Sequence, residues 1–365
     1  MPVNRFLPAD RDDRWFVYWP ACIVVLIALY FVLPGAYGEY IVSVASLGTI
    51  FAIGAIGLNV QFGFTGLLNF GQVMFLMVGA YTTAVLVLDL NWNVFAAMPV
   101  GAVAAALLGL VVGSFSIRLR GDYLAIVTIA VAEMLRIIVR NSGGFRIDPA
   151  TGESGPVGLG GVVGLRGAGG GFDSTLADLL PFIDDRNWRL FAFNAFIVTV
   201  MLFVTWTIKR APWGRSARAI REDEVIAQAL GKPTFVRKLQ SFSLGAFIGA
   251  FAGISLAVQA NFVEPLTWVP LITFRLWIAV ILGGAGTVFG PVVGALVLQL
   301  LFSGVRFLPR IVDTPLFEWV PESAVAANRL GALEGLLLGL LIVIIVLVRP
   351  EGILGRRDDV VLERG

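Results

Sequence analysis

Residues 40–88 read YIVSVASLGTIFAIGAIGLNVQFGFTGLLNFGQVMFLMVGAYTTAVLVL and contain no Asp, Glu, Lys or Arg. A charge-free apolar stretch of this length dissolves only in lipid, because one bilayer crossing needs about 20 apolar residues. Glycines and an asparagine interrupt the stretch near its middle. It therefore predicts two membrane spans, 40–60 and 72–88, separated by a break.

The rest of the chain has the same character. It is 58% hydrophobic and 14% charged, with a mean hydropathy of +0.86, whereas soluble domains carry about 25% charged residues. The apolar runs predict ten spans, at 15–33, 40–60, 72–88, 94–117, 123–139, 188–208, 242–260, 268–282, 288–302 and 330–348. The expected fold class is all-α, a polytopic transmembrane helix bundle of about ten spans (eight to ten).

The basic residues give the expected orientation. With the N-terminus in the cytoplasm, 17 of the 27 lysines and arginines fall on the inner side and eight on the outer side, as the positive-inside rule requires. Both termini are then cytoplasmic. The chain divides into tails at 1–14 and 349–365 and a transmembrane domain at 15–348, with an outer loop at 141–187 and an inner loop at 209–238.

The composition also excludes several classes of function. The chain has no histidine and a single cysteine, Cys22, so disulfides, cysteine–histidine metal sites and histidine acid–base chemistry are not expected. No set of catalytic residues is present, and neither an enzyme activity nor a metal site is predicted. The net charge of +2 gives no reason to expect nucleic-acid binding.

The two longest loops differ in composition. The outer loop is dense in glycine, which predicts little regular structure. The inner loop contains helix formers that end at Gly231 with Pro233 just beyond, which predicts one surface helix over about 216–230. Its apolar positions suit docking of a cytoplasmic partner.

Glycines mark two breaks on the predicted inner side, GFTGLLNFGQ at 63–72 and GGAGTVFGP at 283–291. Unwound backbone at membrane depth must line a cavity or be buried in protein, so each break is either a gate of a permeation path or a tight turn. The two breaks are also candidates for corresponding parts of an internal duplication. The candidate path or gate residues here are Gly66, Asn69, Gly71, Gln72, Gly284 and Gly286.

Other glycines recur four residues apart within the spans, a pattern typical of close helix packing in lipid. These are Gly109 and Gly113, then Gly245, Gly249 and Gly253, then Gly290 and Gly294, and finally Gly335 and Gly339.

Glu133, Arg136 and Arg275 are charged residues that lie within predicted spans. A charge at such depth costs at least about 2.5–3.5 kcal/mol unless it is paired or hydrated. We therefore expect Glu133 to pair with Arg136 or with Arg275. Glu133 and Arg275 are further candidates for the path.

Several segments, in order, resemble one family. They are GLNVQFGFTGLLNFGQVMFLMVGAYTTAVLV, LRGDYLAIVTIAVAEMLRIIVRN, TGESGPVGL, GRSARAIREDEVIAQALGKP, VILGGAGTVFGPVVGALVL and LVRPEGILG. They are similar to the permease subunits of bacterial branched-chain amino acid ABC importers, in particular the M-type subunit. This resemblance implies a multi-pass protein of the bacterial plasma (inner) membrane.

The resemblance also implies that the inner loop couples the chain to an ATPase. The coupling residues would be Arg215, Arg218, Arg221, Glu222, Glu224, Ala227 and Gly231. Val225 and Ile226 stand where the general importer motif has Glu-Ala. The implied partners are a second homologous permease, two ATP-binding-cassette ATPases, an extracytoplasmic solute-binding protein and the lipid bilayer.

The chain lacks a Gly-x4-Gly-Lys-Ser/Thr phosphate loop, so no cofactor is expected on it and ATP would be used by the partner subunits. The implied cargo is a branched-chain amino acid. Permeases for urea, short-chain amides or sugars, and an ion-coupled secondary transporter, remain alternatives.

Overall fold

The structure is a computed structural model that describes residues 15–32, 36–119, 121–147, 154–158, 165–167, 172–179 and 185–312, together with 351–355 and a few isolated positions. Its helices are α1 Trp15–Val32, α2 Ala36–Thr65, α3 Gln72–Leu88, α4 Val94–Ser116, α5 Gly121–Asn141, α6 Phe172–Leu179, α7 Arg186–Arg210, α8 Pro212–Glu222, α9 Glu224–Ala229, α10 Thr234–Ala260, α11 Pro270–Gly283 and α12 Gly290–Val312. Nine of the ten predicted spans coincide with helices, and the tenth, 330–348, lies largely outside the described residues.

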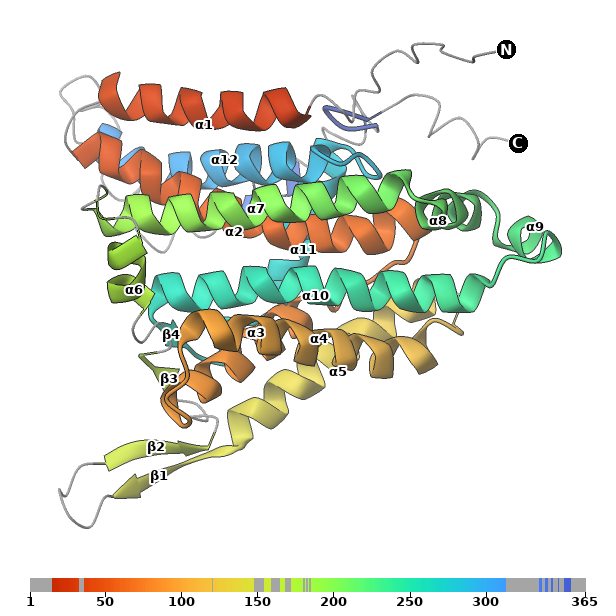
Figure 1. Ribbon diagram of the computed structural model, residues 1–365, viewed down its shortest axis with the longest axis horizontal. Coiled ribbons are helices and arrows are strands. Elements are labelled where there is room, and N and C mark those ends of the chain that lie inside the picture. The colour runs from red at the N-terminus through yellow and green to blue at the C-terminus, as the bar shows by residue number, and fades with distance from the viewer. Residues whose placement is uncertain are drawn as a thin grey trace.

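The long helices run alongside one another, with α8 and α9 at one end of the bundle and α6 with the strands at the other (Figure 1). Within the described residues, four helices are long and apolar enough to cross a membrane: Gly38–Thr65, Val94–Ser116, Arg186–Arg210 and Thr234–Ala260. The helices α3 and α11 are apolar but shorter. The protein is therefore a helical membrane protein.

The centre of the bundle is formed by α2 and α10. In each of them, 72% of the most apolar 18-residue segment is buried inside the protein, compared with 39% in α4 and 44% in α7. The backbones of α2 and α10 meet through glycines: a Cβ on Gly57 would lie 2.7 Å from the Gly245 carbonyl oxygen and 2.9 Å from the Gly249 nitrogen. This close approach is the one that small residues permit between helices in lipid.

Other glycines of the predicted packing pattern also lie at helix contacts. A Cβ on Gly109 of α4 would lie 2.9 Å from the Cβ of Ala246 in α10, and one on Gly253 would overlap the backbone of Leu76 in α3. Tight packing is therefore confirmed at these positions. Gly335 and Gly339 differ, because a Cβ on either would meet no atom of the described chain within 4 Å.

The outer loop holds more regular structure than its composition predicts. Strands β1 (Gly143–Ile147) and β2 (Ser154–Gly158) form an antiparallel hairpin, and β3 (Leu165–Arg166) pairs with β4 (Phe262–Val263). The expectation of little regular structure is wrong for these segments and for α6. The fold as a whole is mostly helical, as predicted, and the two short strand pairs are additions to the helical bundle held by interstrand hydrogen bonds.

Candidate functional site

The two glycine breaks, far apart in the chain, lie side by side. Asn59, near the end of α2, donates from Nδ2 to the Thr287 carbonyl (2.8 Å) and accepts from the Gly286 N–H at Oδ1 (2.8 Å). A Cβ on Gly286 would stand 3.0 Å from the Gly63 carbonyl oxygen. The side chain of Asn59 thus holds the second break against the last turn of α2.

The first break turns back into the bundle. Helix α2 ends at Thr65, and Gly66 follows with φ +72°, a backbone conformation that glycine adopts without a steric penalty. Leu67 and Asn69 are then buried before α3 begins at Gln72. Because irregular backbone is tolerated in a bilayer only when it is satisfied inside the protein, the polar groups of this segment need hydrogen-bond partners within the bundle.

Three fully buried amide side chains supply some of these partners. Asn69 donates from Nδ2 to Gln61 Oε1 (2.7 Å) and to Gln72 Oε1 (2.9 Å), and its Oδ1 accepts from the Gly71 N–H (2.9 Å). Gln61 and Gln72 in turn donate to backbone carbonyls of α10. In this conformation the amides bind one another and the backbone.

Neighbouring helices satisfy the backbone of the same segment. The Thr128 hydroxyl on α5 accepts from the Phe70 N–H (3.1 Å), and Trp277 on α11 donates from Nε1 to the Asn69 carbonyl (3.0 Å). The Trp277 ring also stacks on Phe70, with ring centroids 4.7 Å apart. The first break is therefore held by α5, α10 and α11 together.

Replacing Asn69 by alanine is expected to destabilise the protein by at least about 3 kcal/mol, because each buried polar group left unpaired costs about 1–3 kcal/mol. Thermal unfolding in detergent measures the effect. Asn93→Ala is the control: Asn93 is exposed and accepts from the Phe95 N–H at the start of α4, a cap worth about 1 kcal/mol. Equal melting temperatures for the two variants would contradict the prediction.

The charged residues of the spans fall into two contacts. Arg136 donates to Glu133 from Nε (2.9 Å) and from Nη2 (2.5 Å), and the two side chains are 13% and 36% exposed, respectively. The predicted pairing of Glu133 is thus confirmed for Arg136. The Arg275 guanidinium lies over the ring of Phe302, 4.9 Å from its centroid, so this residue belongs to a different contact.

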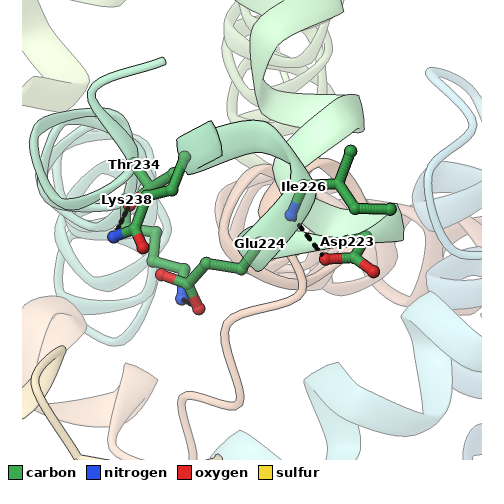
Figure 2. Close-up of polar contacts among 6 residues, drawn as sticks. Asp223, Glu224, Ile226, Thr234 and Lys238 are labelled. Carbon is green, nitrogen blue, oxygen red and sulfur yellow. Dashed lines mark hydrogen bonds and ion pairs between the residues drawn. The ribbon is translucent and has the colours of Figure 1, made fainter. Parts of the chain in front are cut away.

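The inner loop forms two helices where one was predicted over 216–230. Asp223 has φ −154° and ψ 110°, which breaks the helix, and its carboxylate accepts from the Ile226 N–H (2.9 Å) to cap α9 (Figure 2). Such a local side-chain bond competes with the continuous helix. The predicted stop at Gly231 is confirmed: its φ is +75° and the Lys232 N–H donates to the Ala227 carbonyl (3.0 Å).

Helix α9 is attached to α10 by its polar side chains. The Glu224 carboxylate lies 2.5 Å from Lys238 Nζ (Figure 2). Gln228 donates to the Thr234 hydroxyl (3.0 Å). Ala227 is buried beneath them. This attachment leaves an exposed apolar surface, here called the α9 patch, consisting of Val225, Ile226 and Leu230, which are 76%, 58% and 73% exposed.

The predicted coupling residues of α8 point in different directions. Arg215, Arg218 and Glu222 are exposed. Arg221 is half-buried and donates from Nη1 to the Gly63 carbonyl (2.7 Å). Arg221 therefore reaches the first break.

Three further residues that bind the second break or the end of α11 just before it were not predicted. Lys209 donates from Nζ to the Gly286 carbonyl (2.7 Å). Ile353 and Leu354 donate their N–H groups to the carbonyls of Leu282 (2.8 Å) and Gly283 (3.0 Å) at the end of α11. Both residues lie in the LVRPEGILG segment, and nothing in the sequence indicates that this segment binds residues some 70 positions earlier in the chain.

Comparison with known proteins identifies the family of the chain. Residues 40–346 match the family described as "Branched-chain amino acid transport system / permease component". The chain is 31% identical over 343 residues to the high-affinity branched-chain amino acid transport system permease protein LivM of Escherichia coli K12, covering 91% of this chain and 74% of that protein.

Two more distant relatives were found. The chain is 24% identical over 335 residues to the permease protein LivH of E. coli K12, which covers 86% of this chain and 94% of LivH. It is 26% identical over 279 residues to the autoinducer 2 import system permease protein LsrC of E. coli DH10B, with 74% and 75% covered. No solved structure matches the chain. The chain therefore belongs to the family of permease components of branched-chain amino acid transport systems.

Proposed function

We propose that this chain is a permease subunit of an ATP-binding-cassette importer and that its cargo is a branched-chain amino acid. The observation that carries the proposal is the similarity to LivM, which spans 91% of the chain at 31% identity. That similarity covers both glycine breaks and the inner loop with α8 and α9.

The proposed topology has ten spans with both termini in the cytoplasm of a bacterium and the chain in its plasma membrane. The distribution of charge supports it. Arg118, Lys209, Arg221 and Lys238 make contacts around α8, α9 and the first turns of α10. The positive-inside rule assigns that end of the bundle to the cytoplasm. The domain boundaries at 1–14, 15–348 and 349–365 belong to the same proposal.

Energy for import is proposed to come from two separate ATPase subunits, since the chain has no phosphate loop of its own. The surface best suited to meet them is the α9 patch with the exposed Arg215, Arg218 and Glu222 beside it. Three large apolar side chains on an exposed helix with a charged surround have the composition of a docking site.

The translocation path is proposed to run beside the first and second breaks, between this chain and a second homologous permease. Gly66, Asn69, Gly71 and Gln72 hold the first break, and Gly284 and Gly286 belong to the second. Because the amides of the first break already bind one another, opening would require this network to exchange partners. Glu133 and Arg275 are proposed to line or border the path.

A second candidate function is ABC import of a different hydrophilic solute, such as urea, a short-chain amide or a sugar. The similarity to LsrC favours keeping it, because that relative is named for another cargo. An ion-coupled transporter is less well supported, since Glu133 is the one deep carboxylate of the predicted spans and it is paired with Arg136.

Reconstitution tests the proposal. We expect proteoliposomes that contain this chain, a second permease, two ATPases and a binding protein to take up labelled leucine, isoleucine or valine, and to require both ATP and the binding protein. ATP-dependent uptake of another solute alone would move the cargo to the second candidate. Uptake by this chain alone, driven by an ion gradient, would overturn the proposal.

A further inference from the structure

Two cationic side chains, one in the last turn of α7 and one in the last turn of α8, bind backbone carbonyls of the two breaks. Arg221 on α8 donates to the Gly63 carbonyl, and Lys209 in the last turn of α7 donates to the Gly286 carbonyl, each at 2.7 Å. Gly63 lies in the last turn of α2, where the carbonyls lack intrahelical partners and carry the negative end of the helix dipole. A guanidinium is well suited to that position.

Arg221 contacts both breaks. Beyond its bond to Gly63, its Nη1 would lie 2.6 Å from a Cβ on Gly286, and its Cγ would lie 3.5 Å from a Cβ on Gly66. Glycine at position 286 therefore makes room for the arginine, whereas a Cβ at position 66 would only be in ordinary contact with it. The side chain fills the gap between the end of α2 and the second break, next to the Asn59 bridge.

The helix that carries Arg221 is fixed to the bundle. Gly214, Ser216, Ala217 and Ile220 of α8 are buried, and a Cβ on Gly214 would overlap the Lys209 carbonyl. Helix α9, with its exposed patch, follows after the single residue Asp223. A displacement imposed on α9 therefore reaches α8 and Arg221 through a short, well-packed connection.

We propose that Arg221 and Lys209 form a clamp that joins α8 and the adjoining end of α7 to the two glycine breaks, so that a movement of α8 and α9 changes the two breaks together. This inference rests on the proposed function, because the movement is the one an ATPase would impose. Arg221 is then a positioning residue that acts inward on the breaks, whereas the exposed Arg218 on the same helix faces outward.

The first experiment compares Arg221→Ala with Arg210→Ala in the reconstituted importer. Arg210→Ala is the matched control, since it removes the same charge from the exposed last residue of α7, outside both the clamp and the proposed docking surface. We expect Arg221→Ala to assemble with the ATPases and hydrolyse ATP while uptake per ATP hydrolysed falls roughly tenfold, the effect of losing one charged hydrogen bond. Uptake per ATP equal to that of the unaltered protein would count against the clamp.

The second experiment needs neither ATP nor cargo. A Cys22→Ser background removes the one native cysteine, and Ala285→Cys then places a half-buried reporter in the second break. We expect Arg221→Ala or Lys209→Met to raise the rate of maleimide labelling roughly tenfold, and Arg218→Ala to leave it unchanged. Arg221→Lys, which keeps the charge but not the planar fork, should give an intermediate rate.

These readouts separate the inference from the proposed function. If the unaltered complex imports no amino acid, the proposed function fails, and the labelling rates still decide whether the clamp exists. Size-exclusion chromatography identifies any variant that does not fold, and Arg221→Lys decides in the place of an unfolded Arg221→Ala. A labelling rate unchanged in every folded Arg221 and Lys209 variant would overturn the clamp.

Discussion

Gly253→Leu is expected to prevent this protein from folding. Gly253 lies in α10 where the helix touches α3, and a Cβ there would overlap the backbone oxygen, carbonyl carbon and Cα of Leu76. A flexible side chain could rotate away, but backbone cannot, so the two helices would have to separate. Overpacking alone costs about 1–3 kcal/mol in a well-packed core, and separating α3 from α10 would add the loss of their contact.

Size-exclusion chromatography of a fluorescent fusion in detergent, followed by thermal unfolding, measures this effect. Gly304→Leu is the matched control, because a Cβ on Gly304 of α12 would meet no described atom within 4 Å. We expect the control to elute and melt like the unaltered protein. A monodisperse Gly253→Leu protein with an unchanged melting temperature would show that the contact between α3 and α10 is looser than described.

The double variant Val225→Asp/Leu230→Asp is expected to lose binding to the ATPase subunits by at least about 100-fold. Burying one large apolar side chain contributes about 1.5–3 kcal/mol, so losing two removes about 3–6 kcal/mol, and a tenfold change in affinity corresponds to about 1.4 kcal/mol. Because both side chains are largely exposed, folding of the permease itself should not change.

Co-purification with the ATPases and surface plasmon resonance measure the binding. Leu266→Asp provides the control: Leu266 is an exposed apolar residue in the connection between β4 and α11, close to the strand pair at the opposite end of the bundle. We expect that variant to bind the ATPases normally. Normal binding by the double variant as well would remove the α9 patch from the proposed docking surface.

Much of the helical framework could be predicted from the sequence, because lipid imposes a single requirement along the whole chain. A charge-free stretch such as 40–88 has few stable structures other than membrane-spanning helices. Its break at Gly66 was predictable because α2 ends in a backbone conformation that suits glycine. The pairing of Glu133 with Arg136 was also predictable, since the partners lie one helical turn apart.

The sequence does not disclose features that depend on distant partners. Strand β3 exists because residues 262–263 lie beside it, nearly 100 residues later. In the sequence, Asn69 has the character of an amide that lines a path, whereas in the structure it donates to Gln61 and Gln72. Likewise, Arg218 and Arg221 are equivalent in the sequence, and only the position of α2 distinguishes the inward residue from the exposed one.

The bonds from residues 353 and 354 to the end of α11 can form only late in biosynthesis. The ribosome makes the carbonyls of Leu282 and Gly283 about 70 residues before it makes the N–H groups that bind them. At typical rates of translation, roughly 4 to 14 s pass between the two events. By the end of that interval every helix from α1 to α12 has been synthesised, but the end of α11 still lacks these two bonds. A nonsense codon just before residue 351 would therefore yield a chain that can insert its helices and cannot complete this end of the bundle.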